Sequence, residues 1–134
     1  MNSKHTGLHH IEIYVSNLEQ TRQFYEWFLG LLGYHEYQSW DQGFSFLHGS
    51  TYIVFVQTAD KYLDQSYHRC GTGLNHIAFW ANSIDQVDQI QKLLRERGVN
   101  ILYKDRYPHA GGQDHYAMFF EDPDRIKLEL VAPD

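Results

Sequence analysis

Two histidines and one glutamate have the residue types and the spacing of a metal-binding set. His10 lies in the segment Gly-Leu-His-His-Ile, and His76 lies in Gly-Leu-Asn-His-Ile, 66 residues later. Glu129 lies in the last predicted strand. Two imidazoles and a carboxylate leave coordination positions of a divalent ion open, and Fe(II), Mn(II), Zn(II) and Ni(II) accept such ligands. An ion held this way can polarise a substrate oxygen or bind dioxygen.

The two histidine segments belong to an internal repeat. The offset of 66 residues is close to half of the 134-residue length, and it also carries Asn17 onto Ser83 and Gln20 onto Gln86. Asn and Ser are good helix N-caps, and a Gln three residues later can bond back to the cap amide. The pattern therefore predicts, in each half, a strand, a helix and three more strands. The later strands are expected at residues 34–40, 44–47 and 51–57 in the first half, and at 100–104, 115–120 and 126–131 in the second.

Apolar stripes at helical spacing support both helices. They comprise Leu18, Thr21, Phe24, Tyr25, Phe28 and Leu32 in the first half, and Ile84, Val87, Ile90, Leu93 and Leu94 in the second. Gly33 and Gly98 are expected to end these helices, since glycine readily takes the positive φ of a helix terminus. The sequence predicts one α+β domain over residues 1–134, built from a βαβββ module over 1–66 and another over 67–134.

The strand pattern places the candidate ligands on one face. Apolar residues alternate with His10, Glu12 and Tyr14 in the first strand, so these three point away from the helix. His76 is the repeat equivalent of His10, and Glu129 alternates with the apolar residues of the last strand. If the two sheets close into a trough, its inside carries two imidazoles and a carboxylate. A histidine on a strand is also a common structural residue, so the pattern alone leaves both interpretations open.

Further polar and aromatic residues share this face or lie close to it. Glu12 is a candidate catalytic base, a fourth ligand, a partner that orients an imidazole, or a surface carboxylate. His115 is a candidate proton carrier if its face points inward, and a solvent-facing residue if it does not. Tyr14, Trp80 and Phe119 would give a partly apolar pocket its walls, although aromatic residues on strands often belong to the core.

Composition excludes several classes of protein. Seventeen acidic against eleven basic residues give a formal charge of −6, which argues against nucleic acid as a partner. No apolar run reaches the roughly 18 residues of a membrane span, and the first residues lack the apolar core of a signal peptide. A single cysteine, Cys70, excludes an intrachain disulfide. A cytoplasmic location and a small-molecule partner are therefore expected, without nucleic acid or membrane.

Several motifs together resemble the vicinal oxygen chelate superfamily. They are the two histidine segments, Phe24-Tyr25 in the first helix, and Phe-Glu-Asp-Pro-Asp followed by Lys-Leu-Glu-Leu within residues 120–130. The superfamily includes glyoxalase I, extradiol dioxygenases, fosfomycin-resistance enzymes, methylmalonyl-CoA epimerase and bleomycin-binding proteins. The resemblance implies paired βαβββ modules in an open barrel-like cup, association as a homodimer, and metal ligation by His10, His76 and Glu129.

The sequence also departs from individual branches of this superfamily. Val54 stands where glyoxalase I-like members place a fourth ligand, usually Glu, and a valine cannot ligate. Glu12 replaces a hydroxyl residue common in the fosfomycin-modifying enzymes, and no late arginine is present to hold a phosphonate. Arg125 replaces the glycine that usually follows Asp-Pro-Asp.

Two functional hypotheses from different classes follow. The first is a metal-dependent enzyme that activates a small oxygen-chelating substrate by Lewis-acid chemistry, as a glyoxalase-like lyase or isomerase or as an extradiol-type dioxygenase. The second is a metal-free protein of the bleomycin-resistance type that binds and sequesters a drug. Retention of both histidines and Glu129 argues for the first.

Overall fold

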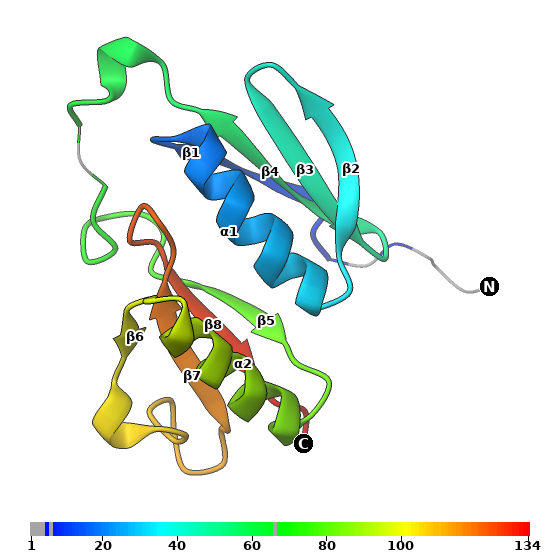
Figure 1. Cartoon of the computed structure of the whole chain (residues 1–134), viewed down its shortest axis with the longest axis vertical. Coiled ribbons are helices and arrows are strands. Elements are labelled where there is room, and N and C mark those ends of the chain that lie inside the picture. Colours follow the sequence, from blue (N-terminus) through cyan, green and yellow to red (C-terminus); the bar gives the residue numbers. More distant parts are fainter. Residues whose placement is uncertain (1–4, 6, 66) are drawn as a thin grey trace. The chain divides into compact units, whose positions relative to one another are not determined.

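The structure, a computed structural model, describes residues 5, 7–65 and 67–134. The chain divides into two compact units, Met1–Ser66 and Tyr67–Asp134. Each unit contains one four-stranded sheet and one long helix, as Figure 1 shows. The predicted α+β class with two βαβββ units is confirmed. No helix in the described part of the chain combines the length and the apolar character needed to cross a membrane.

The first unit begins with β1 (His10–Val15) and α1 (Leu18–Leu31). Three antiparallel strands follow, β2 (His35–Trp40), β3 (Gly43–His48) and β4 (Thr51–Gln57), and then the short 3-10 helix η1 (Asp60–Tyr62). The strand order in the sheet is β1-β4-β3-β2, and β1 pairs in parallel with β4. The crossover that this parallel pair requires therefore consists of α1, β2 and β3.

The second unit repeats this arrangement with β5 (Ile77–Trp80) and α2 (Ile84–Glu96). After the helix come β6 (Ile101–Leu102), the 3-10 helix η2 (Lys104–Arg106), β7 (Ala117–Glu121) and β8 (Lys127–Val131). The strand order is β5-β8-β7-β6, and β5 pairs in parallel with β8.

The predicted bounds of two strands in the second half are wrong. The strand expected at residues 100–104 contains only Ile101 and Leu102, because Tyr103 adopts the left-handed conformation at φ 56° and ψ 40° and η2 begins after it. The strand expected at 115–120 starts only at Ala117, so His115 lies in the segment before β7.

The predicted helix ends are confirmed. The side chains of Asn17 and Ser83 each accept a hydrogen bond of 3.0 Å from the amide three residues later. Gln86 reaches one residue further back than expected, accepting from the amide of Asn82 at 2.6 Å. In the first unit, Gln57 on β4 accepts from the first helical amide, that of Leu18, at 2.8 Å.

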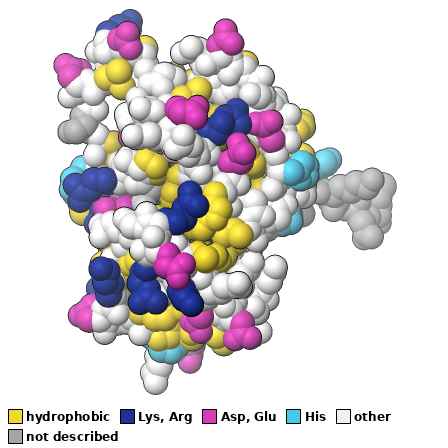
Figure 2. All heavy atoms as spheres, in the orientation of Figure 1, with side chains coloured by type: hydrophobic (Ala, Val, Ile, Leu, Met, Phe, Trp, Pro, Cys, Tyr) yellow, Lys and Arg dark blue, Asp and Glu magenta, His cyan; other side chains and the backbone are white. Residues whose placement is uncertain are grey.

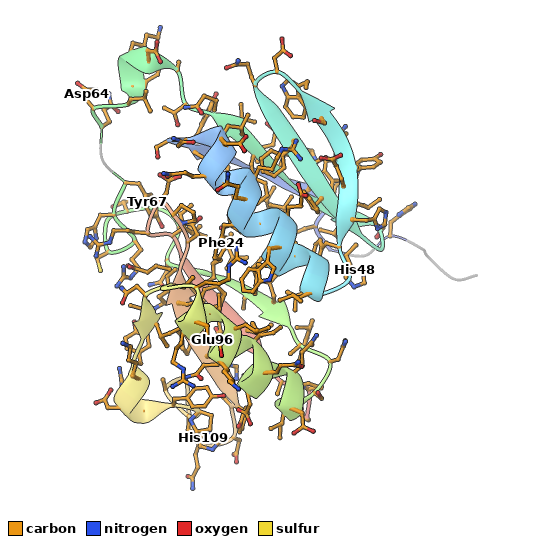
Figure 3. All side chains as sticks on the ribbon, viewed as in Figure 1. Phe24, His48, Asp64, Tyr67, Glu96 and His109 are labelled. Atoms are coloured by element: carbon orange, nitrogen blue, oxygen red, sulfur yellow. The ribbon has the colours of Figure 1, made fainter. Side chains whose placement is uncertain are left out.

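The helices bury one face of each sheet. The most deeply buried large side chains comprise Tyr25, Phe28, Leu29, Phe44 and Phe55 in the first unit and Ile90, Leu94, Met118, Phe120 and Leu128 in the second. Phe24, labelled in Figure 3, lies on the buried stripe of α1 as predicted. Ile84 departs from the predicted stripe of α2, since it is 47% exposed at the first turn. On the other face, Tyr14 and Trp80 are each 73% exposed.

Candidate functional site

Glu129 is the centre of a side-chain cluster in the second unit. It lies on β8, the strand between β5 and β7, and its Cα partners are Ala78 and Phe119. The residue is only 4% exposed. A buried carboxylate is costly unless its oxygens are paired. Both oxygens of Glu129 have a partner, one in His76 and the other in His115.

The ring of His76, immediately before β5, is held at both nitrogens. Nε2 lies 3.0 Å from Oε1 of Glu129, and Nδ1 lies 2.7 Å from Oδ1 of Asn75. When Nδ1 donates to Asn75, the Nε2 of the neutral ring carries the lone pair that binds a metal. Bonds of about 2.1 Å at a right angle would place two donor atoms roughly 3.0 Å apart. The 3.0 Å separation of His76 Nε2 and Glu129 Oε1 matches this spacing, and it also matches a direct hydrogen bond between the two groups.

His115 reaches Glu129 from the segment that precedes β7. Its Nε2 contacts Oε2 of the carboxylate. The approach depends on Gly111, because a Cβ at that position would lie 2.6 Å from Cδ2 of the His115 ring. A side chain on Gly111 would thus displace the imidazole.

Asp88 on α2 anchors the segment that carries His115. The hydroxyl of Tyr107 donates to its Oδ1, and the hydroxyl of Tyr116 donates to the same oxygen at 2.6 Å. Burial, and then the hydrogen bond to Asp88, raises the pKa of Tyr107 above its ordinary value. Two protonated phenols on one carboxylate hold the loop against the helix on both sides of His109 and the glycines.

A pocket of about 470 Å³ lies beside His115. Its walls include Trp80, His109, Tyr116 and Val131. Figure 3 labels His109 on this segment of the second unit. Small-molecule sites commonly have volumes of about 300–1,000 Å³. The pocket is therefore large enough for a small substrate, and His115 links it to Glu129.

His10 lies on β1 in the first unit and has a comparable local setting. Its Nδ1 is 2.8 Å from Nδ1 of His9, and its Nε2 is 3.6 Å from Oε1 of Glu12. The ring stacks on Tyr52 with centroids 4.7 Å apart. Glu12 is well exposed, with a side-chain accessibility of 60%. The 3.6 Å separation is longer than a hydrogen bond, so the four interpretations of Glu12 stay open.

The strand register shows why the first unit lacks a counterpart of Glu129. Glu12 pairs with Val54 across the parallel strands β1 and β4, just as Ala78 pairs with Glu129 across β5 and β8. Val54 thus occupies the position equivalent to Glu129, and it is 2% exposed. This register supports the alignment of the last strands of the two halves, which placed Val54 at the position of a ligand.

The full three-ligand set stays a prediction. No group of three or more His, Cys, Asp or Glu side chains within residues 5, 7–65 and 67–134 is arranged so that it could hold a metal ion. His76 and Glu129 meet in the second unit, whereas His10 belongs to the first.

Sequence reasoning missed three residues that position these side chains. Asn75 precedes His76 as His9 precedes His10, and each contacts Nδ1 of the histidine that follows it. The repeat could have revealed this role, because Asn75 and His9 occupy equivalent positions. Asp88 and Gly111 carried none, because their roles depend on how the segment before β7 folds back onto α2 and β8.

Comparison with known proteins identifies the family. The model of the Glyoxalase/Bleomycin resistance protein/Dioxygenase superfamily matches residues 7–130. The chain belongs to this superfamily. The uncharacterized protein YqjT of Bacillus subtilis is 56% identical over 126 residues, which cover 94% of this chain and 98% of YqjT.

Solved structures of the superfamily confirm the fold. A protein from Bacillus halodurans, assigned provisionally as a glyoxalase, is 56% identical with a TM-score of 0.92, over 94% of this chain and 95% of that one. The fosfomycin resistance protein FosX of Listeria monocytogenes is 26% identical with a TM-score of 0.71, over 96% of this chain and 94% of FosX. A variant of that FosX, 25% identical with a TM-score of 0.68 over 96% and 91% of the two chains, was crystallised with Mn(II) and 1S,2S-dihydroxypropylphosphonic acid.

Proposed function

We propose that this superfamily member is a metal-dependent enzyme that acts on a small oxygen-chelating substrate. His10, His76 and Glu129 would hold one divalent ion, Fe(II), Mn(II), Zn(II) or Ni(II), in a cytoplasmic homodimer. The observation that carries the proposal is the 3.0 Å approach of His76 Nε2 to Glu129 Oε1, with Nδ1 of the same ring occupied by Asn75. The Mn(II) complex of FosX supports the same chemistry in a relative.

Each residue of the site would have a distinct task. The ion, when bound, would polarise an oxygen of the substrate. Val54 leaves the position equivalent to Glu129 without a donor, so more of the coordination sphere is open to substrate oxygens. His115, which borders the pocket and contacts Glu129, would carry a proton on that side. Glu12, beside His10, would act as a base on the other.

Metal titration tests the ligand set. Protein treated with a chelator and then dialysed would be titrated with Mn(II), Ni(II), Zn(II) and, under argon, Fe(II), and the bound metal measured by elemental analysis. We expect about one ion per chain for the wild type. His76→Ala and Glu129→Gln should each weaken binding by more than about tenfold, because removal of a ligand costs at least as much as removal of its hydrogen-bonding partner.

His35→Ala is the matched control, since His35 is an exposed histidine on β2. It should bind metal as the wild type does. Equal metal affinity in all four proteins would overturn the ligand assignment. Oxygen uptake then separates the two enzyme branches: an Fe(II)-loaded protein that consumes oxygen with catechols is a dioxygenase, and one that consumes none belongs to the lyase or isomerase branch.

The competing function is a metal-free binding protein of the bleomycin-resistance type. One observation favours it: each oxygen of Glu129 lies within hydrogen-bonding distance of an imidazole nitrogen, so the buried carboxylate is satisfied without an ion when both of these nitrogens carry a proton. Less than about 0.2 ion per chain after metal supplementation, with tight binding of an aromatic drug, would establish this function in place of the enzyme.

A further inference from the structure

Lys127 is a half-buried ammonium on the same strand as Glu129. Its Nζ donates to the hydroxyl oxygen of Tyr103 at 3.0 Å. The same nitrogen lies 5.1 Å from the ring centroid of Tyr103 and 5.4 Å from that of Phe119. A cation above aromatic faces is attracted by the ring quadrupoles, but this attraction does not neutralise its charge.

The described residues give Lys127 no carboxylate within 4.0 Å. Its cross-strand partner is Glu121, which would be the natural counter-ion. The oxygens of Glu121 are instead taken by Asn100, Arg69 and Arg125. The carboxylate that faces Lys127 across the strands is therefore engaged by other donors.

A second cation, that of Arg106, lies over the ring of Tyr103. The guanidinium carbon of Arg106 is 4.7 Å from the centroid of Tyr103. Tyr103 holds this position in a left-handed backbone conformation, which is uncommon for a residue with a side chain. Such strain persists where surrounding contacts impose it, and it is concentrated at binding sites. In Figure 2, Lys and Arg side chains gather at the lower left, where Figure 1 labels β6.

Lys127 and Glu129 lie close enough together for one small molecule to contact both. Lys127 and Glu129 are two residues apart on β8 and share a face, so their Cα atoms lie roughly 6.6 Å apart. The ring of Phe119 spans this interval, because it contacts His76 at a centroid distance of 5.9 Å and lies beneath the ammonium of Lys127.

We propose that Lys127 and Tyr103, with Arg106 at the rim, form a subsite for an anionic group of the substrate: a carboxylate, a phosphonate or a phosphate. The substrate would place this group on Lys127 and its chelating oxygens towards Glu129. The assignment of the bound molecule as a substrate rests on the proposed function. The anion subsite itself does not depend on a metal.

The test is anion binding by protein freed of metal with EDTA. Methylphosphonate, inorganic phosphate and acetate would each be titrated at constant ionic strength, with ³¹P NMR for the first two and calorimetry for all three. We expect a Kd on the order of 1 mM for the preferred anion, about the strength of one or two charge-assisted hydrogen bonds. Lys127→Met should weaken binding at least fivefold, Tyr103→Phe about twofold, and Lys127→Arg should retain it.

Lys61→Met is the matched control, because Lys61 also lies 5.1 Å from a tyrosine ring, that of Tyr62, but in the other unit. It should bind the anion as the wild type does. The proposal is overturned if no anion binds at 50 mM, or if Lys127→Met and Lys127→Gln, both folded by circular dichroism, bind like the wild type. Metal titration of the same samples separates the two ideas: anion binding without metal binding would refute the proposed enzyme and leave the subsite intact, and the reverse result would refute the subsite alone.

Discussion

Replacing Glu121 by glutamine should destabilise the second unit in a pH-dependent way. The side chain of Glu121 is 5% exposed and contacts Arg69, whose side chain is 20% exposed. Asn100 donates to Oε1 at 2.7 Å, and Arg125 approaches Oε2 at 3.4 Å. Burial alone would raise the pKa of Glu121, but the Asn100 hydrogen bond and the two guanidinium charges outweigh it, so the pKa lies below its ordinary value.

The size of the destabilisation follows from the contacts that each partner of Glu121 loses. Glutamine keeps an oxygen for Asn100, so that bond survives. The charge-assisted bond to Arg69 is worth about 1.5–3 kcal/mol, whereas the pair with Arg125, whose side chain is 67% exposed, is worth at most about 1 kcal/mol. Glu121→Gln should therefore lower the free energy of unfolding by about 2–3 kcal/mol at pH 7.

Urea unfolding of both proteins between pH 7 and pH 3 measures this difference. A carboxyl group whose pKa is depressed in the folded state stabilises above its unfolded pKa of about 4.3, and the stabilisation is lost as pH falls through the lower folded-state pKa. The gap between wild type and variant should thus be constant above about pH 5 and shrink in acid. Arg125→Gln should cost less than about 1 kcal/mol. A gap below 0.5 kcal/mol at pH 7, or one that persists unchanged at pH 3, would refute the reasoning.

Four further substitutions test other parts of the structure. Asn75→Ala frees Nδ1 of His76 and should weaken metal binding about 10- to 100-fold, measured by titration; unchanged affinity would contradict the positioning role. Asp88→Ala should speed proteolysis and hydrogen exchange between residues 107 and 116 while leaving α2 protected. Gly43→Ala should destabilise, because its Cβ would lie 2.6 Å from a backbone oxygen of β4, whereas Gly30→Ala, with open space around it, should stabilise by about 0.5–1 kcal/mol.

Most of the fold was predictable because its signals are local. The caps at Asn17 and Ser83 and the alternation in β1 depend on neighbouring residues, and the repeat carries each signal twice. The repeat also identified Val54 as the equivalent of Glu129 in the first unit, since the parallel register of the two units is the same. Agreement between local pattern and repeat is what made these predictions succeed.

The segment between β6 and β7 was less predictable. The apolar and aromatic residues after Asn100 have a strand-like pattern, yet Tyr103 turns left-handed and ends β6 after Leu102. Tertiary contacts decide this path: Lys127 bonds to Tyr103, and Asp88 bonds to the two tyrosines further on. For the same reason, the sequence left open whether His115 points inward or toward solvent, and it did not predict the contact of His115 with Glu129.

The hydrogen-bonded ladders have a consequence for assembly. Every described strand pairs within its own four-stranded sheet, and each sheet ends on a parallel pair formed by the first and last strands of one half. Two copies of the chain could therefore exchange a whole half by domain swapping without breaking a hydrogen bond between the described strands. Only the connection between the two halves would need a new course, so a change in the length or stiffness of that connection should govern whether the halves come from one polypeptide or two.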